Sequence, residues 1–295
     1  MMLRCLGFLL ALLATPLVAQ VSGTFRWEEP GGGKLRLMQG SSPVLEYNFG
    51  PQLKAGVPAN RRREGYIYPL YTPAGVSPLD DFPADHLHHR GLFWAWMSIK
   101  YEGKTYDIWT LGPGIEHRFH KILDKYAGAN AASLSVENGW YVGGKLIVRE
   151  TADFTVDRAI DGKRDIDLSL AFEAIEKSVV IAGSPDQRKG YGGLCVRFAP
   201  RTETRIITPE GIVSQDENEV PHEWAALEAL YSGKRAGVRI TSDPDNPQNP
   251  PGWCLRPYGF VGANFPGVDP FTLVPGEALA LNYTVTVYDG AWNKE

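Results

Sequence analysis

The sequence predicts an all-β protein, an antiparallel β-sandwich, on three observations. Apolar and polar residues alternate with a period of two through most of the apolar segments. Clusters of Gly, Asp and Pro separate these segments at short intervals. Only one brief segment, 222–230, resembles a helix, so the alternating strand–helix pattern of a parallel sheet is absent. We therefore expect two large antiparallel sheets that pack face to face.

Individual segments show the alternation clearly. In RDIDLSLAFEA (164–174) and ALNYTVTVYDG (280–290), every second residue of the central part is large and apolar, which describes a strand with one buried face. KLIVRETADFTVDR (145–158), GGLCVRFAP (192–200) and RAGVRITSD (235–243) have the same pattern. The sequence contains no linker, repeat or low-complexity tract, so we expect residues 20–295 to form a single β-sandwich domain.

Residues 1–19 have the pattern of a secretory signal peptide. Arg4 precedes an apolar stretch, 6–17, that is too short to span a bilayer, and Ala19 offers a small residue for cleavage. We therefore expect an exported protein of the periplasm or the extracellular space. No later segment reaches the length of a membrane span, so no membrane insertion is expected once the signal is removed.

The charge and the cysteines narrow the class of protein. A formal net charge of -4 gives no reason to expect nucleic-acid binding. The triplet Arg61–Arg63 is followed at once by Glu64, which is typical of a solvated loop. After signal removal Cys195 and Cys254 remain, each in an apolar context, and the sequence leaves open one disulfide or two buried free thiols.

The segment DHLHHRG, Asp85–Gly91, is the most distinctive part of the chain. It holds three of the six histidines together with a carboxylate and a guanidinium. It falls where a proline-rich loop meets an aromatic strand, and loops held by a rigid sheet often carry function. In extended backbone, His86 and His88 would point to one face and His89 to the other.

One interpretation of this segment is acid/base chemistry. An imidazole of His86, His88 or His89, oriented by Asp85, can transfer a proton, while Arg90 holds a carboxylate or a developing oxyanion. The purely structural alternative pairs Asp85 with Arg90 and satisfies the imidazoles with turn carbonyls.

A metal site is the other interpretation of the histidines. The H-x-H pair of His86 and His88 with a nearby carboxylate can bind a divalent transition metal. A third ligand would come from Glu116, His117 or His120 in GIEHRFH.

Further binding candidates lie outside the heptapeptide. The glycines of KGYGGLCVRF (189–198) let the backbone approach a ligand, and Tyr191 and Arg197 can line the same pocket as the histidines. A bulged strand and a surface ion pair are the alternative. His117 is expected as another substrate-binding residue. The 8 Trp and 13 Tyr residues suit either core packing or a platform for sugar stacking.

Several motifs together resemble a known family. They are IYPLYTPAGV, DHLHHRGLFWAW, YDIW, GYGGLCVRF, NPQNPPGW with RPYGF, and LVPGEALALNYTVTVYDG. In this order, from about Tyr66 to Gly290, they resemble the so-called methane oxygenase PmoA family. The last motif is also similar to the galactose mutarotase-like β-supersandwich. That resemblance implies a sugar cleft on one sheet and proton transfer by histidine with a carboxylate. The late catalytic carboxylate of mutarotases has no identified counterpart, since Glu277 is expected in a turn.

These observations favour an exported enzyme that acts on a carbohydrate or glycoside by histidine acid/base chemistry, as a lyase, a hydrolase or an epimerase. A non-catalytic carbohydrate-binding module is one alternative. A metal-dependent oxygenase, implied by the family label, is the other. The expected partner is a small molecule or a glycan. The preferred interpretation requires no cofactor, and a divalent transition metal remains open.

Overall fold

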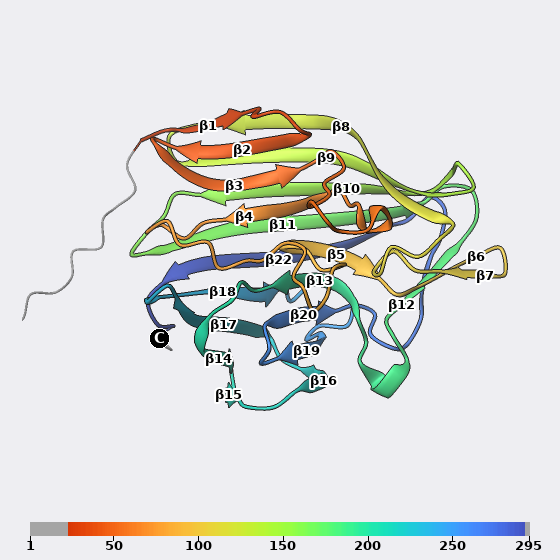
Figure 1. Cartoon of the computed structure of the whole chain (residues 1–295). Coiled ribbons are helices and arrows are strands. Elements are labelled where there is room, and N and C mark those ends of the chain that lie inside the picture. Colours follow the sequence, from red (N-terminus) through yellow and green to blue (C-terminus); the bar gives the residue numbers. More distant parts are fainter. Residues whose placement is uncertain (1–22, 293–295) are drawn as a thin grey trace, which may run out of the picture.

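A computed structural model describes residues 23–292 of the chain (Figure 1). These residues form two nine-stranded sheets and one four-stranded sheet, and all neighbouring strands are antiparallel. The helical segments of this part of the chain are two short 3-10 turns, Ala59–Arg61 and Asp186–Arg188. The predicted all-β antiparallel sandwich is confirmed.

The first large sheet carries the candidate site. In spatial order it consists of β1 (Phe25–Glu28), β2 (Lys34–Gln39), β3 (Ser42–Asn48), β4 (Tyr66–Leu70), β5 (Leu92–Trp96), β13 (Gly192–Arg197), β20 (Phe260–Asn264), β19 (Gly252–Arg256) and β16 (Glu217–Pro221). Its centre joins strands that are far apart in the sequence, because β5 pairs with β13 and β13 pairs with β20.

The second large sheet and the small sheet complete the fold. The second sheet consists of β15 (Gly211–Val213), β14 (Thr202–Thr208), β17 (Trp224–Tyr231), β18 (Lys234–Ser242), β22 (Ala278–Asp289), β11 (Lys163–Ala174), β10 (Lys145–Asp157), β9 (Ala131–Val142) and β8 (Ile115–Ala127). The small sheet consists of β21 (Phe271–Leu273), β12 (Val179–Ala182), β6 (Ser98–Tyr101) and β7 (Lys104–Tyr106).

Large aromatic side chains fill the space between the two nine-stranded sheets. Trp96 of β5 packs against Trp140 of β9 and Phe172 of β11, with ring centroids 5.3 and 5.0 Å apart. Trp94 of the same strand contacts Phe154 of β10. Each such side chain contributes roughly 1.5–3 kcal/mol by leaving water. The period-two pattern therefore identified the buried faces of these strands correctly, as the alternating burial of β11 shows.

The helix expected at 222–230 is absent, and that prediction is wrong. Trp224–Tyr231 is strand β17, which lies between β14 and β18 in the second sheet. Its central residues are buried, because β17 pairs with a neighbour on each side. Pairing and burial of this kind outweigh the helix propensity of an Ala- and Leu-rich segment.

The outer face of the first sheet is also apolar at its centre. Register places Phe93, Cys195, Gly262 and Cys254 side by side across β5, β13, β20 and β19. The two cysteines flank Gly262, so they lie two strand spacings apart, about 9–10 Å, which exceeds the reach of a disulfide. Both are buried free thiols, which settles the alternative left open by the sequence.

The N-terminal predictions fall outside this description. The predicted signal peptide, residues 1–19, lies outside the described residues, and export stays a prediction. No helix within residues 23–292 is long and apolar enough to cross a membrane.

Candidate functional site

The histidine segment forms consecutive turns at the end of the loop between β4 and β5. The amide of His86 donates to the Pro83 carbonyl, and the amide of His89 donates to the His86 carbonyl, at 3.1 and 2.9 Å. The expectation that His89 would point away from His86 and His88 is therefore wrong, because it assumed extended backbone. The turns gather all three rings on the outer face of the first sheet.

The three imidazole rings touch one another. Ring centroids are 4.6 Å apart for His86 and His89, 4.6 Å for His88 and His89, and 5.8 Å for His86 and His88. His89 is buried among the rings of Phe93 and Phe260 and of Trp109, which follows β7. His86 and His88 are half-buried. We call these three residues the histidine cluster.

The imidazole nitrogens of the histidine cluster form no hydrogen bond with a main-chain oxygen of residues 23–292. The Nδ1 atom of His89 is buried without a hydrogen-bond partner in that part of the chain. The structural alternative, in which turn carbonyls satisfy the rings, is therefore not what the structure shows. Buried polar atoms without a partner cost free energy, and they often mark functional sites.

Burial keeps two of the rings neutral. Burial first, and then the neighbouring His86 and Arg63, lower the pKa of His88 to about 4. Burial, followed by the charges of His88 and His86, lowers the pKa of His89 further. Both rings are uncharged at neutral pH, so each can donate one hydrogen bond and accept one.

Asp85 joins the cluster to a distant strand. Nη2 of Arg197, at the end of β13, donates to both carboxylate oxygens of Asp85 at 2.7 Å. Nδ1 of His86 lies 3.1 Å from the same carboxylate. Burial raises the pKa of Asp85, but Arg197 and His86 outweigh it, so the net shift is downward. The pair predicted by the structural alternative, Asp85 with Arg90, does not form; Asp85 pairs with Arg197.

Arg197 keeps donor atoms that form no hydrogen bond with the described residues. Its side chain is only 7% exposed, and its Nε and Nη1 atoms have no hydrogen-bond partner among the described residues. Because Arg197 and His86 both contact Asp85, Arg197 lies beside the histidine cluster, as the sequence predicted.

Tyr258, in the motif RPYGF, is a site residue that no local pattern predicts. It lies in the turn between β19 and β20, and it is 41% exposed. Its ring is nearly parallel to that of His86, at 4° and a centroid distance of 5.3 Å. The Arg197 guanidinium lies 5.0 Å from the ring centroid of Tyr258. Nothing local marked Tyr258, because strand pairing alone carries its hairpin to the cluster.

Tyr191 lies one layer behind the histidines. Its ring stacks on Trp109 at 5.3 Å and meets Phe260 edge-on at 5.9 Å, and both of these rings contact His89. The structure therefore connects Tyr191 to the histidine cluster through shared neighbours.

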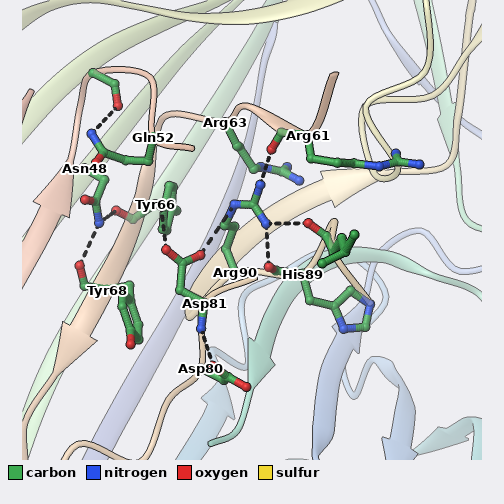
Figure 2. A network of polar contacts seen from close by, with 12 residues as sticks. Asn48, Gln52, Arg61, Arg63, Tyr66, Tyr68, Asp80, Asp81, His89 and Arg90 are labelled. Atoms are coloured by element: carbon green, nitrogen blue, oxygen red, sulfur yellow. Dashed lines mark hydrogen bonds and ion pairs between the residues drawn. The ribbon is translucent and has the colours of Figure 1, made fainter. Parts of the chain in front are cut away.

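Arg90 holds the histidine segment through main-chain carbonyls (Figure 2). Its side chain is fully buried, and Nη1 donates to the carbonyls of Leu87 and His89 at 3.0 and 2.6 Å. Nη2 donates to the Arg61 carbonyl, and Nε lies 3.5 Å from Asp81. The donors of Arg90 point at the loop, so its position is that of a residue that orients the cluster.

His117 lies away from the cluster, on β8. Its Nε2 atom is 3.1 Å from the buried carboxylate of Glu150, and its Nδ1 atom is 3.2 Å from the Glu64 carbonyl. Burial opposes protonation of His117, but Glu150 outweighs it and raises the pKa. The structure thus does not bring His117 to the other predicted substrate-binding residues.

The extra ligands of the metal interpretation are engaged elsewhere. Glu116 pairs with Arg118, and His120 contacts Glu137 and Tyr141. Within residues 23–292, no group of three or more His, Cys, Asp or Glu side chains is arranged to hold a metal ion. The described residues therefore do not fit the metal site that His86 and His88 would begin.

The solvated loop expected at Arg61–Arg63 is wrong for Arg63. This side chain is buried, with 5% of the residue exposed, and it donates to the carbonyls of Trp94 and Trp109 at 3.1 and 3.4 Å. Its guanidinium lies 5.0 Å from the ring centroid of Phe93. A cation on an aromatic ring is a favourable arrangement that local sequence does not reveal.

Comparison with solved structures finds distant similarities. The heparan sulfate lyase HepC from Pedobacter heparinus has 10% identity and a TM-score of 0.37, over 93% of this chain and 37% of that one. The heparinase III BT4657 gene product has 9% identity and a TM-score of 0.35, over 92% and 35%. The chain thus spans little more than a third of the length of either lyase structure.

A copper-containing benzylamine oxidase from Hansenula polymorpha has 11% identity and a TM-score of 0.30, over 97% of this chain and 63% of that one. TM-scores this low carry no inference about substrate or mechanism. No curated protein matches the sequence.

A family model covers the site and most of the chain. It matches residues 34–295, which include every residue of the candidate site. Its description assigns no activity, so it lends no support to the oxygenase label of the predicted PmoA resemblance. The chain belongs to the family described as "Family of unknown function (DUF6807)".

Proposed function

We propose that this protein is a carbohydrate-active enzyme that abstracts a proton from a sugar or glycoside, with Asp85 and His86 as the proton-transfer pair. The observation that carries the proposal is the histidine cluster itself. Three imidazoles lie in contact at a loop end, and no main-chain oxygen of the described residues satisfies their nitrogens.

The lowered pKa values of His88 and His89 distinguish the roles of the imidazoles. A general base works best when its pKa is near the pH of the reaction. The pKa of about 4 makes His88 a weak base, and that of His89 is lower still. Within the histidine cluster, the ring of His86 contacts a carboxylate, that of Asp85, and such a contact orients an imidazole. We therefore assign proton transfer to His86, and hydrogen bonding to the substrate to His88.

The surrounding charge favours one class of reaction. Arg61, Arg63 and Arg90 all act on the His88 ring, and Arg197 acts on His89. Hydrolysis of a glycoside passes through a cationic transition state and uses two carboxylates. Proton abstraction beside a carbonyl or carboxylate builds negative charge, which guanidinium groups stabilise. Elimination or epimerisation therefore suits this site better than hydrolysis.

Arg197 and Tyr258 complete the proposed site. The free donors of Arg197 are placed to bind a developing oxyanion. The ring of Tyr258 stacks on His86 and is 41% exposed, so its exposed part offers an apolar surface for a sugar ring. Tyr191 supports the site from behind through Trp109.

The test is a panel of glycosides, aldoses and uronate-containing polysaccharides. Elimination is followed by ultraviolet absorbance of the unsaturated product, and epimerisation by exchange of the abstracted proton in heavy water. We expect His86→Gln to lower turnover by at least about 100-fold, with an unchanged melting temperature.

The matched control is His120→Gln, which removes another histidine that contacts a carboxylate, on β8. Its turnover is expected to equal that of the wild type. Full activity of His86→Gln, or equal losses in the two variants, would refute the assignment of His86.

A carbohydrate-binding module without catalysis is the second candidate, and the exposed ring of Tyr258 favours it. In that case a glycan binds without turnover. Tyr258→Ala would then weaken binding by about five- to tenfold, as expected for loss of one stacking ring, while His86→Gln would leave affinity nearly unchanged. Calorimetry on the same panel distinguishes the two functions.

A further inference from the structure

A cavity of about 530 Å³ lies next to the arginine triplet. It is lined by Pro51, Ala59, Asn60, Arg62, Arg63, Glu64, Ile108, Leu111, Ile115, Glu116, His117, Arg118 and Phe119. Its volume suits a small organic molecule. It shares Arg63 with the surroundings of the histidine cluster, but no histidine of that cluster lines it.

The arginine triplet at this cavity forms no ion pair with a carboxylate of the described residues. Arg61 donates to the Thr110 carbonyl and Arg63 to the carbonyls of Trp94 and Trp109. Arg62 is exposed, and its side chain forms no hydrogen bond or ion pair with residues 23–292. Figure 2 shows the side chains of Arg61 and Arg63 above Arg90. Three consecutive guanidinium groups therefore lack a carboxylate partner.

The buried position of Arg63 makes this absence costly. A buried charge is normally paired, because removal from water is expensive and only a counter-charge offsets it. Burial, followed by the charge of Arg90, lowers the pKa of Arg63 to about 9, so the group remains a cation at neutral pH. The ring of Phe93 compensates this charge only in part.

The carboxylates of the cavity are already engaged. Glu116 pairs with Arg118 through Nε and Nη2, at 2.8 and 2.7 Å. Glu64 accepts the amide of Phe119 at 2.9 Å. The lining thus carries three guanidinium groups, Arg62, Arg63 and Arg118, against the two carboxylates of Glu64 and Glu116, so one positive charge is in excess. The same lining includes the apolar side chains of Ile108, Leu111 and Phe119.

We infer that this cavity binds a small molecule with a carboxylate group, which Arg62 and Arg63 hold while the apolar wall covers its body. A bidentate contact with a guanidinium is the strongest recognition of a carboxylate in proteins. The carboxylate can belong to a free organic acid or to the uronate unit of a sugar. The inference does not depend on the proposed catalysis, because none of the proposed catalytic groups lines the cavity.

The experiment is isothermal titration calorimetry on the full chain with three probes. D-Glucuronate carries a carboxylate on a sugar ring, D-glucose is its uncharged counterpart, and succinate is a free organic acid. The test variant is Arg62→Gln, whose side chain has no partner to lose. The control is Arg26→Gln, which removes the same charge from an exposed position on β1.

We expect glucuronate or succinate to bind and glucose not to bind. Arg62→Gln should weaken binding by about tenfold or more, the loss expected for one charge-assisted hydrogen bond, and Arg26→Gln should not. Binding of glucuronate alone identifies a uronate sugar, and equal binding of both acids identifies a general carboxylate site. Failure of both acids to bind, or equal weakening by the two variants, overturns the inference. Neither result alters the expected activity of His86→Gln.

Discussion

At the level of single residues, the site depends on the partners of two arginines, Arg90 and Arg197. Asp85 lies close to Arg90 in the chain, yet the arginine with which it forms an ion pair is Arg197, 112 residues away. Arg90 instead spreads its donors over three main-chain carbonyls and Asp81. One guanidinium thus faces the candidate site and the other holds the loop that carries it. The two arginines are not interchangeable in what they stabilise.

The buried role of Arg90 yields a stability prediction. Arg90→Met should lower the free energy of unfolding by about 3–5 kcal/mol, because it leaves a buried carboxylate and several carbonyls unpaired. Arg90→Lys should recover little of this loss, since a single ammonium cannot reach all four acceptors. Urea unfolding followed by circular dichroism measures both. The exposed Arg62→Gln is the control, expected within about 0.5 kcal/mol of the wild type. An unchanged unfolding midpoint for Arg90→Met would contradict this account.

At the element scale, the loop between β4 and β5 couples the histidine cluster to folding. Turns within the loop bring His86, His88 and His89 into contact, and at its end the Gly91 carbonyl accepts the amide of Arg197 on β13. Burial lowers the pKa of His88 to about 4, whereas an unfolded histidine titrates near 6.5. The unfolded chain therefore binds more protons between these values, and stability falls as the pH falls through that window.

This linkage predicts a pH dependence. Between pH 6.5 and 4, each such histidine should lower the free energy of unfolding by up to about 1.4 kcal/mol per pH unit. Asp81 opposes it, because burial raises its pKa to about 6 and its protonation stabilises the fold below that value. His88→Asn should flatten the pH profile, whereas Asp81→Asn should steepen it. Unfolding measured at several pH values checks both, and parallel profiles for His88→Asn and wild type would be the contrary result.

At the scale of the whole molecule, the two large sheets determine where the site can exist. Trp94 and Trp96 point from β5 into the space between the sheets, while Phe93 points outward to the rings around His89. One strand thus supports the core with one face and the candidate site with the other. The site is therefore backed by a strand whose five residues are all buried.

Truncating a side chain between the two sheets should therefore lower stability more than truncating one on the outer face of the first sheet. Trp96→Ala should cost about 3–5 kcal/mol, the range for large cavities in a core, because the Trp96 ring is fully buried and Nε1 donates to the Phe265 carbonyl. Tyr258→Ala, on the outer face, should cost less than about 1 kcal/mol. Thermal unfolding followed by circular dichroism compares them. Similar losses for the two variants would show that the outer face is part of the stabilising core.

Much of the site could not have been found from local sequence. The histidine segment was visible because its groups are adjacent in the chain. The conformation of the segment was not, since an assumed extended backbone separated His89 from its neighbours. Tyr258 and Arg63 had no local signal, because one sits in a hairpin turn and the other in a run of arginines that is typical of solvent. The helix expected at 222–230 failed for the same reason, since pairing with β14 and β18 decides that segment.

The strands can be located from the amino-acid sequence alone, because the alternation of side chains is a property of the pleated backbone and is visible residue by residue. The same sequence shows that Asp85 and the histidines are neighbours in the chain. The three-dimensional fold is needed to place β5, β13, β20 and β19 side by side, and hence to bring Arg197 and Tyr258 to the cluster. Strand pairing joins distant segments through main-chain hydrogen bonds that every residue other than proline can donate, so no local pattern specifies it.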